Sequence, residues 1–189
     1  MVISNTDRVR VIEILAKAFE DNKSVSYIVK QDKKRLARIT LLMEYAYFMC
    51  HTYGRVILSE DKNACALVLF PHTKKISLNG LYWDAKLVFK VMGIRNLLKV
   101  LRREGLIKQQ HPKTPFYYLW FIGVDPLVRR QGLGGTLLRE LIKEAELMRL
   151  PFYLETSTLT NIPWYQKFGF RIYHELDIDY RLYFLKNPT

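Results

Sequence analysis

Apolar residues recur three or four positions apart, the spacing of one helix face, in five stretches of the chain. Thr6 or Asp7 is expected to cap the first stretch, Asp32 to open the second, and Gly93 to separate the third from the fourth. Between the first two lies Val25–Val29, a short apolar run that fits either a strand or a loop. The predicted helices are residues 7–19, 32–49, 83–92, 94–106 and 134–149.

Runs of β-branched, aliphatic and aromatic residues fill most of the remaining chain and predict strands. Ala64–Phe70 is apolar on both faces, which is typical of a central strand. A hairpin is expected where two of the strands flank the turn Glu60–Asn63. Pro163 suits the start of a short helix, and Gly169 its end. The predicted strands are residues 55–59, 64–70, 116–124, 152–156, 171–176 and 179–185.

The connections between these elements indicate the fold class. Helix 134–149 joins strand 116–124 to strand 152–156, and a crossover of this kind is right-handed and places the two strands parallel. The last two strands are expected to close the sheet as an antiparallel pair. The order of elements in these 189 residues therefore predicts a single α/β (α+β) domain, in which helices flank a central mixed β-sheet.

A turn rich in arginine and glycine lies between strand 116–124 and the helix that follows. The first amide groups of a helix have no internal partner, and the helix dipole adds positive charge there. Glycines at positions 132, 134 and 135 let an anion approach those amides, while Arg129 and Arg130 add full charges. The spacing matches neither a P-loop nor a dinucleotide fingerprint. The turn predicts a site for a phosphate or diphosphate.

Two motifs in this region resemble those of a known family. The pattern Val-x-Pro-x-x-Arg-x-x-Gly-x-Gly, residues 124–134, resembles the acetyl-CoA signature of the GNAT superfamily of N-acetyltransferases. The family's second motif resembles Leu154–Ser157 followed by Asn161–Phe170. The residues of this motif are most similar to those of puromycin N-acetyltransferase-like members. Many members carry an asparagine seven residues before Tyr165, where this chain has Thr158.

The resemblance implies a GNAT-like fold with acetyl-CoA as co-substrate. Residues 116–176 would form the acetyl-CoA-binding core, and residues 71–115 a helical insertion that packs on the sheet and walls the acceptor site. The cofactor would lie where strands 116–124 and 152–156 splay apart. Acetyl transfer would then be direct, so that positioning supplies much of the rate. The residues implied in cofactor binding are Ile122, Gly123, Val124, Arg129, Arg130, Gln131, Gly132, Gly134, Gly135 and Thr136.

Transfer to an amine requires two proton movements. An alkylammonium has a pKa of about 10.4, so a base is needed at neutral pH. Glu155 is the first choice, because a carboxylate in an apolar strand at the cleft has a raised proton affinity; alternatively, it faces solvent or pairs with a basic residue. His111, Tyr117 and Tyr118 are weaker choices. Tyr165 is predicted to protonate the departing thiolate, and the alternative is a core aromatic.

The charge of the chain is basic and unevenly distributed. Its formal net charge is +12, with 30 lysines and arginines against 18 acids. Residues 70–115 contain ten of these basic residues and only Asp84 and Glu104 as acids. Such a segment can attract nucleic acid, an anionic membrane or an anionic substrate, or it can be a solvated basic face. The basic face lacks interleaved aromatic residues, so single-strand nucleic-acid binding is not expected.

Other residue types narrow the class further. Cys50 and Cys65 have no further cysteines for a metal site and are expected to be buried thiols. The four histidines form no metal-binding pair, so no metal is predicted. No apolar run is long enough to span a membrane, and no signal peptide is recognised at the N-terminus. A cytoplasmic protein is expected, and homodimerisation is left open.

The leading hypothesis is an acetyl-CoA-dependent N-acetyltransferase that acts on a primary amine of a small molecule. One alternative keeps the fold and acetylates a protein N-terminus or a lysine. Another is a basic nucleic-acid or membrane-binding module, built on residues 71–115, with a vestigial cofactor site. The acceptor side lies in the insertion and the N-terminal helices, where no motif constrains the residues, so the acceptor amine is not identified.

Overall fold

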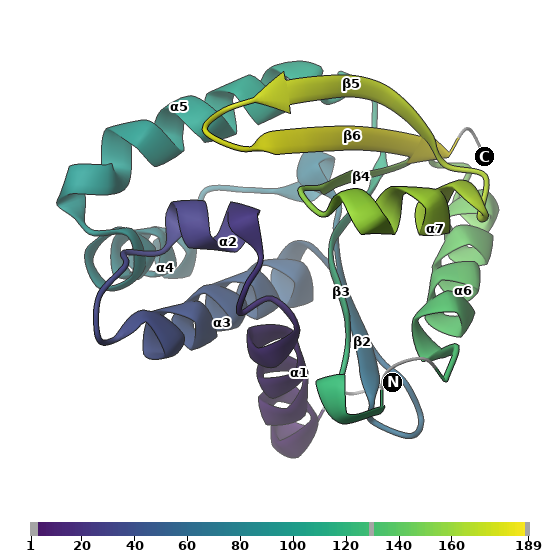
Figure 1. The fold of residues 1–189 in the computed structure, drawn as a ribbon, viewed down its shortest axis with the longest axis horizontal. Helices are drawn as coiled ribbons and strands as arrows, with labels where there is room; N and C mark the ends of the chain where they lie inside the picture. Colours follow the sequence, from purple (N-terminus) through teal and green to yellow (C-terminus); the bar gives the residue numbers. More distant parts are fainter. Residues whose placement is uncertain (1–3, 129–130, 188–189) are drawn as a thin grey trace.

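The computed structural model describes residues 4–128 and 131–187, which build a central sheet covered by helices (Figure 1). Within these residues the sheet has six strands in the order β1-β2-β3-β4-β6-β5. Only β3 and β4 are parallel, and the other neighbours are antiparallel. The mixed sheet confirms the predicted α/β fold. The strands are β1 Gly54–Leu58, β2 Ala64–Leu69, β3 Tyr117–Val124, β4 Phe152–Thr156, β5 Arg171–Asp177 and β6 Arg181–Asn187.

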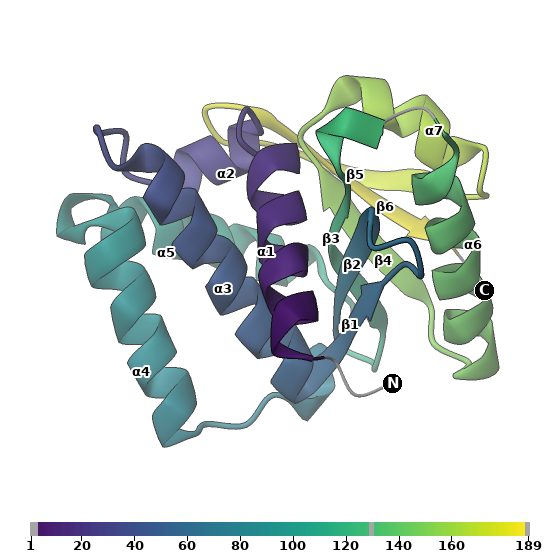
Figure 2. The ribbon, with the colours of Figure 1, turned by 90° about the horizontal axis from the view of Figure 1, so that it is seen from below.

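Helices cover both faces of the sheet (Figure 2). One face packs against α1 and α3, and the opposite face packs against α6 and α7. Helix α4 continues into a wider π-helical turn, Leu87–Met92, before Gly93 and α5. The helices are α1 Asn5–Ala18, α2 Lys23–Ile28, α3 Arg35–Tyr53, α4 Leu78–Lys86, α5 Ile94–Gln110, α6 Leu133–Leu147 and α7 Ile162–Gln166.

Helix boundaries differ from the prediction where short polar side chains take backbone partners. Ser4, not Thr6 or Asp7, caps α1: its hydroxyl accepts from the Asp7 amide, and the Asp7 carboxylate accepts from the Ser4 amide. This reciprocal pair is a capping box, which stabilises the first turn. Asp32 precedes α3 and accepts from Lys34. The unassigned run Val25–Val29 is largely helical, because it belongs to α2.

Two more helices are longer than expected. Ser77 caps α4 by accepting from the Gly80 amide, so that α4 begins at Leu78 and not at Trp83. Gly93 has a φ of 75°, a left-handed value that favours glycine, and it separates α4 from α5 as predicted. Helix α5 extends to Gln110, beyond the expected end at Leu106.

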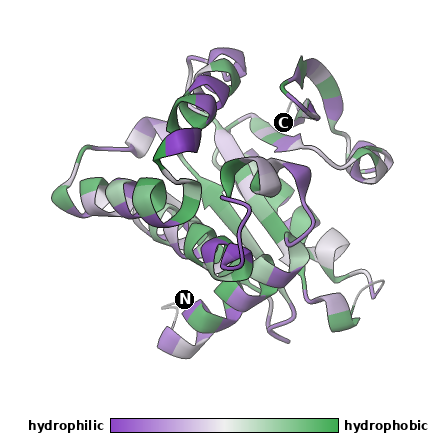
Figure 3. Ribbon diagram, turned by 60° about the vertical axis from the view of Figure 1, so that its left-hand side comes forward, coloured by the Kyte–Doolittle hydropathy of each residue, from purple (hydrophilic) through white to green (hydrophobic). Residues whose placement is uncertain are grey.

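The sheet separates two apolar cores. In Figure 3 the strands are mostly green, while the helices alternate between green and purple along their length. Every residue of β2 is buried, which confirms that it is a central strand. Its alternate residues divide between the two sides: Cys65 and Leu67 face α1 and α3, and Ala66 and Val68 face α6.

An irregularity in β3 redirects its last residues. Leu67 pairs with Phe121 but Val68 pairs with Leu119, so Trp120 is an extra residue on β3. A bulge of this kind breaks the alternation of side chains. Trp120 and Phe121 therefore both pack toward α1 and α3, and Ile122 then faces α6.

The insertion 71–115 packs differently from the expectation of a helical layer on the sheet. Helix α4 lies against α3: the rings of Trp83 and Phe48 stack with centroids 5.3 Å apart, and Tyr45 donates to Asp84 over 2.8 Å. Helix α5 reaches the sheet at β6 and β5: Ile107 packs with Leu182, and the Gln110 carbonyl accepts from Tyr173. The insertion thus forms an outer layer beside α3 and the β6 side of the sheet.

Both cysteines are free and buried, which confirms the expectation for them. Burial raises the pKa of Cys50, and raises that of Cys65 to about 12. Neither thiol is therefore a reactive nucleophile in the folded protein. No helix in the described part of the chain is long and apolar enough to cross a membrane. Across the described ranges, no cluster of three or more His, Cys, Asp or Glu side chains could hold a metal ion.

Candidate active site

The glycine turn forms the N-terminus of α6. The predicted anion ligands Arg129 and Arg130 lie outside the described residues. Gly132 is the N-cap, with a φ of 80°, and its carbonyl accepts from the amides of Gly135 and Thr136. No side chain caps this helix in the part of the chain that the structure describes. The first amides of α6 therefore lack side-chain partners and are available to an anion.

Two of the glycines also have a packing role. A Cβ atom on Gly134 would lie 3.4 Å from Val124, and one on Gly135 would lie 3.3 Å from Phe168. Around Gly132, by contrast, no atom lies within 4 Å of an added Cβ, so this position is constrained by its backbone conformation. The absence of side chains lets the start of α6 approach β3 and α7 closely and leaves its amides uncovered.

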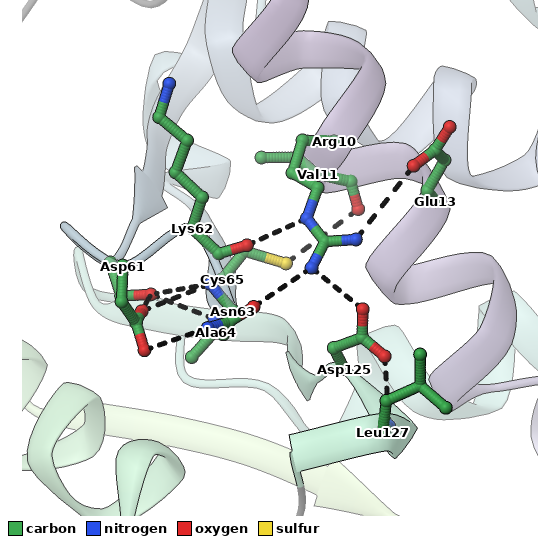
Figure 4. A network of polar contacts seen from close by, with 11 residues as sticks. Arg10, Val11, Glu13, Asp61, Lys62, Asn63, Ala64, Cys65, Asp125 and Leu127 are labelled. Atoms are coloured by element: carbon green, nitrogen blue, oxygen red, sulfur yellow. Dashed lines mark hydrogen bonds and ion pairs between the residues drawn. The ribbon is translucent and has the colours of Figure 1, made fainter.

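An arginine from α1 fixes the beginning of this turn (Figure 4). Arg10 donates to the Lys62 carbonyl over 2.8 Å, to the Asn63 side chain over 3.1 Å and to Asp125 over 2.8 Å. Asp125 also accepts from the Leu127 amide, and this hydrogen bond with the Arg10 contact lowers the pKa of its carboxyl. One guanidinium thus joins α1, the β1–β2 turn and the end of β3.

Arg10→Met is expected to lower the free energy of unfolding by about 1 to 3 kcal/mol, because it leaves the buried Asp125 without its charged partner. Chemical denaturation measures the change. Because the pKa of Asp125 is lowered in the folded state, the ionised carboxylate contributes its full stabilisation above pH ~3.9, the pKa in the unfolded chain. That stabilisation is lost as the pH falls through the folded-state pKa. The difference in unfolding free energy between wild type and Arg10→Met should therefore shrink at low pH. Glu13→Gln is the control, since it removes only the exposed ion pair between Glu13 and Arg10, whose charged atoms are 4.0 Å apart. Equal losses of stability in the two variants would contradict the role of Arg10 as the partner of Asp125.

A cavity of about 900 Å³ opens beside the turn. The paired residues of β3 and β4 end at Leu119 and Leu154, whereas β3 continues to Val124, so the strands part as the resemblance implied. The backbone of β3 beyond the bulge therefore faces the cavity without a strand partner on that side. Of the predicted cofactor-binding residues, those that line the cavity are Ile122, Gly123, Val124, Gln131, Gly132, Gly134 and Gly135.

Several positions depart from or add to that set. Thr136 lies beyond the lining residues. Gly123 lines the cavity, yet its missing side chain serves packing, since a Cβ there would lie 3.0 Å from Leu15. Thr158, which stands where many family members have an asparagine, lines the cavity, and so does Asn161. The cavity wall therefore has a hydroxyl and an amide side chain in this segment.

Glu155 lies in the cavity wall and is the centre of a hydrogen-bonded group. One of its carboxylate oxygens lies 2.5 Å from His111 Nε2, and the other accepts from the Tyr118 hydroxyl over 2.5 Å. The side chains of Glu155 and His111 are only 9% and 14% exposed. Burial, followed by the nearby carboxylate, raises the pKa of Tyr118, so its hydroxyl stays protonated. Three residues considered separately from the sequence thus form one unit.

Two other tyrosines lie apart from this unit. Tyr117 points to the opposite face of the sheet, where it donates to Glu144 over 2.8 Å, so it does not serve as a base in the cavity. Tyr165 lines the cavity and is buried against Trp164 and Phe170. Burial raises its pKa, and its hydroxyl has no hydrogen-bond partner within residues 4–128 and 131–187. It is both a core aromatic and a free donor.

The far wall of the cavity contains an arginine that the sequence grouped with the solvated basic face. Arg103 of α5 is buried and donates to Tyr180 over 2.7 Å, to Ser24 and to Glu104. It shares the buried side of α5 with Val100 and Ile107, at a spacing of three and four residues. This spacing is the signal in the sequence that could have predicted the burial of Arg103, because it places the residue on the buried face of α5.

Comparison with known proteins gives one family match. Residues 91–170 match the model of the Acetyltransferase (GNAT) family. This segment contains the end of the insertion, β3, the glycine turn, α6, β4 and α7, and hence most of the cavity wall described above.

Solved structures share the fold over nearly the whole chain. A Corynebacterium glutamicum protein described as histone acetyltransferase HPA2 and related acetyltransferase is 18% identical, with a TM-score of 0.68, over 98% of this chain and 93% of its own. An N-acetyltransferase from Staphylococcus aureus is 15% identical, with a TM-score of 0.58, over 97% of each chain. A mosquito arylalkylamine N-acetyltransferase like 5b is 14% identical, with a TM-score of 0.56, over 98% of this chain and 97% of its own.

Proposed function

We propose, from the premise that this chain belongs to the GNAT superfamily of acetyltransferases, that it transfers the acetyl group of acetyl-CoA directly to a primary amine of a small molecule. Membership makes the protein an acyltransferase, and GNAT members use acetyl-CoA. The nature of the acceptor and the roles of individual residues are the proposal. A cytoplasmic location is part of it.

One observation carries the proposal: a single cavity is lined by the uncapped start of α6, the parted strands β3 and β4, and Glu155. A diphosphate at the α6 amides and an amine beside Glu155 would therefore lie in the same cavity. The cofactor, when bound, supplies an activated acetyl thioester. The chain contributes the binding, the orientation and the proton transfers.

The start of α6 fits a diphosphate group. Its amides are uncapped, Gly132 leaves open space above the turn, and the helix dipole adds positive charge. The backbone of Ile122, Gly123 and Val124 would hold the extended arm of the cofactor through groups not used by β2. Arg129 and Arg130 would add charge to the diphosphate site, and Gln131 would line it.

Glu155 would take the proton from the acceptor ammonium. It faces the cavity, while His111 lies behind it and is not among the lining residues. With a hydrogen on Nε2, His111 would donate to the Glu155 carboxylate and orient it, so that Glu155 itself holds the proton taken from the acceptor ammonium. Tyr118 donates to the other carboxylate oxygen and holds the side chain in place. The unit removes the proton that would otherwise block the lone pair.

Tyr165 would donate a proton to the departing thiolate. Its raised pKa keeps the hydroxyl protonated above pH 10, so this donor does not titrate in the working range. Tyr165→Phe is expected to lower kcat by about 10- to 100-fold with little change in acceptor KM, measured by steady-state rates. Tyr173→Phe, which alters a tyrosine outside the cavity lining, is the control. Unchanged kcat in Tyr165→Phe would assign the residue to packing alone.

The lining of the cavity on the side of Glu155 favours a small molecule as the acceptor. The described walls there combine aromatic side chains, among them Phe19, Tyr45 and Trp120, with the Glu155 carboxylate and the Arg103–Glu104 ion pair. Aromatic walls and a carboxylate suit a cation with an apolar body. A peptide or protein amine is the alternative; a peptide amine that outcompetes small amines would favour it.

Incubation of the pure protein with acetyl-CoA and a panel of small amines, with release of free thiol as readout, tests the proposal. Cys50 and Cys65 are buried and add little background to this assay. We expect saturable, amine-dependent thiol release. Binding of DNA, RNA or anionic vesicles without any binding of CoA would instead favour a module with a vestigial cofactor site.

A further inference from the structure

The insertion exposes an unusual amount of apolar surface. On the segment around α4, five large apolar side chains are between 55% and 92% exposed: Ile76, Leu78, Leu81, Tyr82 and Phe89. On α5, Ile94, Leu98 and Leu101 are 67%, 80% and 56% exposed. Soluble proteins rarely expose so many large apolar side chains on one segment of the chain unless the surface has a partner.

These side chains are arranged as helix stripes. Ile94, Leu98 and Leu101 are spaced by four and three residues, so they share one side of α5, and the buried side carries Val100, Arg103 and Ile107. Leu78, Leu81 and Tyr82 have the corresponding spacing on α4. Packing inside this chain therefore does not account for the exposed stripes. We call these eight side chains and the basic residues beside them the insertion surface.

Unpaired cations lie on α5 and on the two segments that flank α4. Arg95 and Arg102 each follow an exposed apolar residue of α5, and Lys90 follows Phe89. The other members are Lys74, Lys75 and Lys108. All six are exposed, and none makes an ion pair with another described residue. Their charge is therefore available to a partner.

A basic hollow lies where the two helices meet. A cavity of about 790 Å³ there is lined by Phe89, Ile94 and Arg95. Lys30, which follows α2, and Lys99 of α5 line it as well. Lys30 and Lys99 already pair with Asp32 and Asp179, at 3.4 and 3.0 Å, whereas Arg95 is unpaired. The hollow thus combines apolar walls with one uncompensated guanidinium, beside the exposed stripes.

We propose that the insertion surface docks on an anionic lipid bilayer. Apolar side chains flanked by lysine and arginine match the interface between acyl chains and anionic headgroups. A second copy of this chain would bring two like-charged surfaces together, which is repulsive. The phosphate backbone of a nucleic acid would pair with the cations, and Tyr82 and Phe89 could stack on bases, but the six aliphatic side chains of the surface would stay exposed to water. The inference does not depend on the acetyl-transfer activity.

Vesicle co-sedimentation of the full chain tests the proposal, with phosphatidylcholine vesicles compared with vesicles in which part of that lipid is replaced by phosphatidylserine. We expect binding only to the anionic vesicles, weakened by salt. The double variant Arg95→Ala/Arg102→Ala should lower the partition coefficient about 25-fold, at about fivefold for each charge. Leu98→Ser should lower it about tenfold.

Matched control variants lie on the other side of the sheet. Lys143→Ala/Lys167→Ala removes two exposed cations from α6 and the end of α7, and Leu147→Ser replaces a leucine that is 86% exposed. These should keep wild-type partition. All variants alter exposed side chains, and their thermal midpoints confirm that they fold.

Three outcomes would overturn the docking proposal. The first is wild-type protein that does not sediment with anionic vesicles. The second is an equal loss of partition in the control variants and in the insertion-surface variants. The third is self-association in sedimentation velocity that Leu98→Ser abolishes while vesicle binding persists in that variant, which would assign the surface to a second copy.

Discussion

Glu155→Gln is expected to lower kcat by about 100-fold at neutral pH, while the dissociation constant for CoA stays unchanged. The amide keeps the size of the side chain but cannot accept the ammonium proton. Initial rates at saturating acetyl-CoA measure kcat, and titration calorimetry measures CoA binding. The combination separates a catalytic role of Glu155 from damage to the cavity.

The pH dependence of the deficit sharpens this test. As the pH approaches the pKa of the acceptor amine, about 10.4 for an alkylamine, the amine deprotonates by itself and the base becomes less important. The ratio of wild-type to variant rates should therefore shrink with rising pH. Glu175→Gln, an exposed carboxylate of β5, should behave as wild type. A Glu155→Gln enzyme with unchanged kcat would exclude Glu155 as the base.

Gly134→Asp is expected to weaken CoA binding about 100-fold. The new carboxylate would lie at the uncapped start of α6 and repel the diphosphate, by about 2 to 3 kcal/mol at partly screened distances. The helix itself should tolerate the change, because an acidic residue in the first turn interacts favourably with the helix dipole. Titration calorimetry with CoA measures the affinity of the variant.

Gly134→Asn is the matched control, because asparagine has nearly the same size and no charge. A Cβ at this position lies 3.4 Å from Val124, an ordinary contact, so bulk alone should cost much less. We expect the aspartate variant to bind CoA at least about tenfold more weakly than the asparagine variant. Equal affinities of the two variants would show that the turn does not hold an anion.

Periodicity predicted most elements of the fold, and it failed where local polar contacts or the third dimension decide. The amphipathic patterns located five helices, and the apolar run Ala64–Phe70 located the central strand. The bulge at Trp120 could not be predicted, because the alternation of side chains simply reverses within an apolar run. The position of β6 between β4 and β5 depends on pairing between distant segments, which spacing does not encode.

The sequence predicted many of the residues that line the proposed cofactor side of the cavity, and it did not predict the acceptor side. Consecutive residues of one strand and one turn line the proposed cofactor side, so a linear motif describes them. The acceptor side is assembled from separate segments: Tyr118 and Glu155 come from adjacent parallel strands, and His111 comes from the end of α5. Their hydrogen bonds required the folded chain, although each residue had been considered individually.

Titration calorimetry of CoA into the well-folded wild-type protein tests the central claim most directly, namely that the start of α6 and the parted strands hold the thioester carrier. The account predicts a saturable heat of binding at one site, together with a rise in the thermal midpoint as CoA is added. No heat and no stabilisation at millimolar CoA would contradict it.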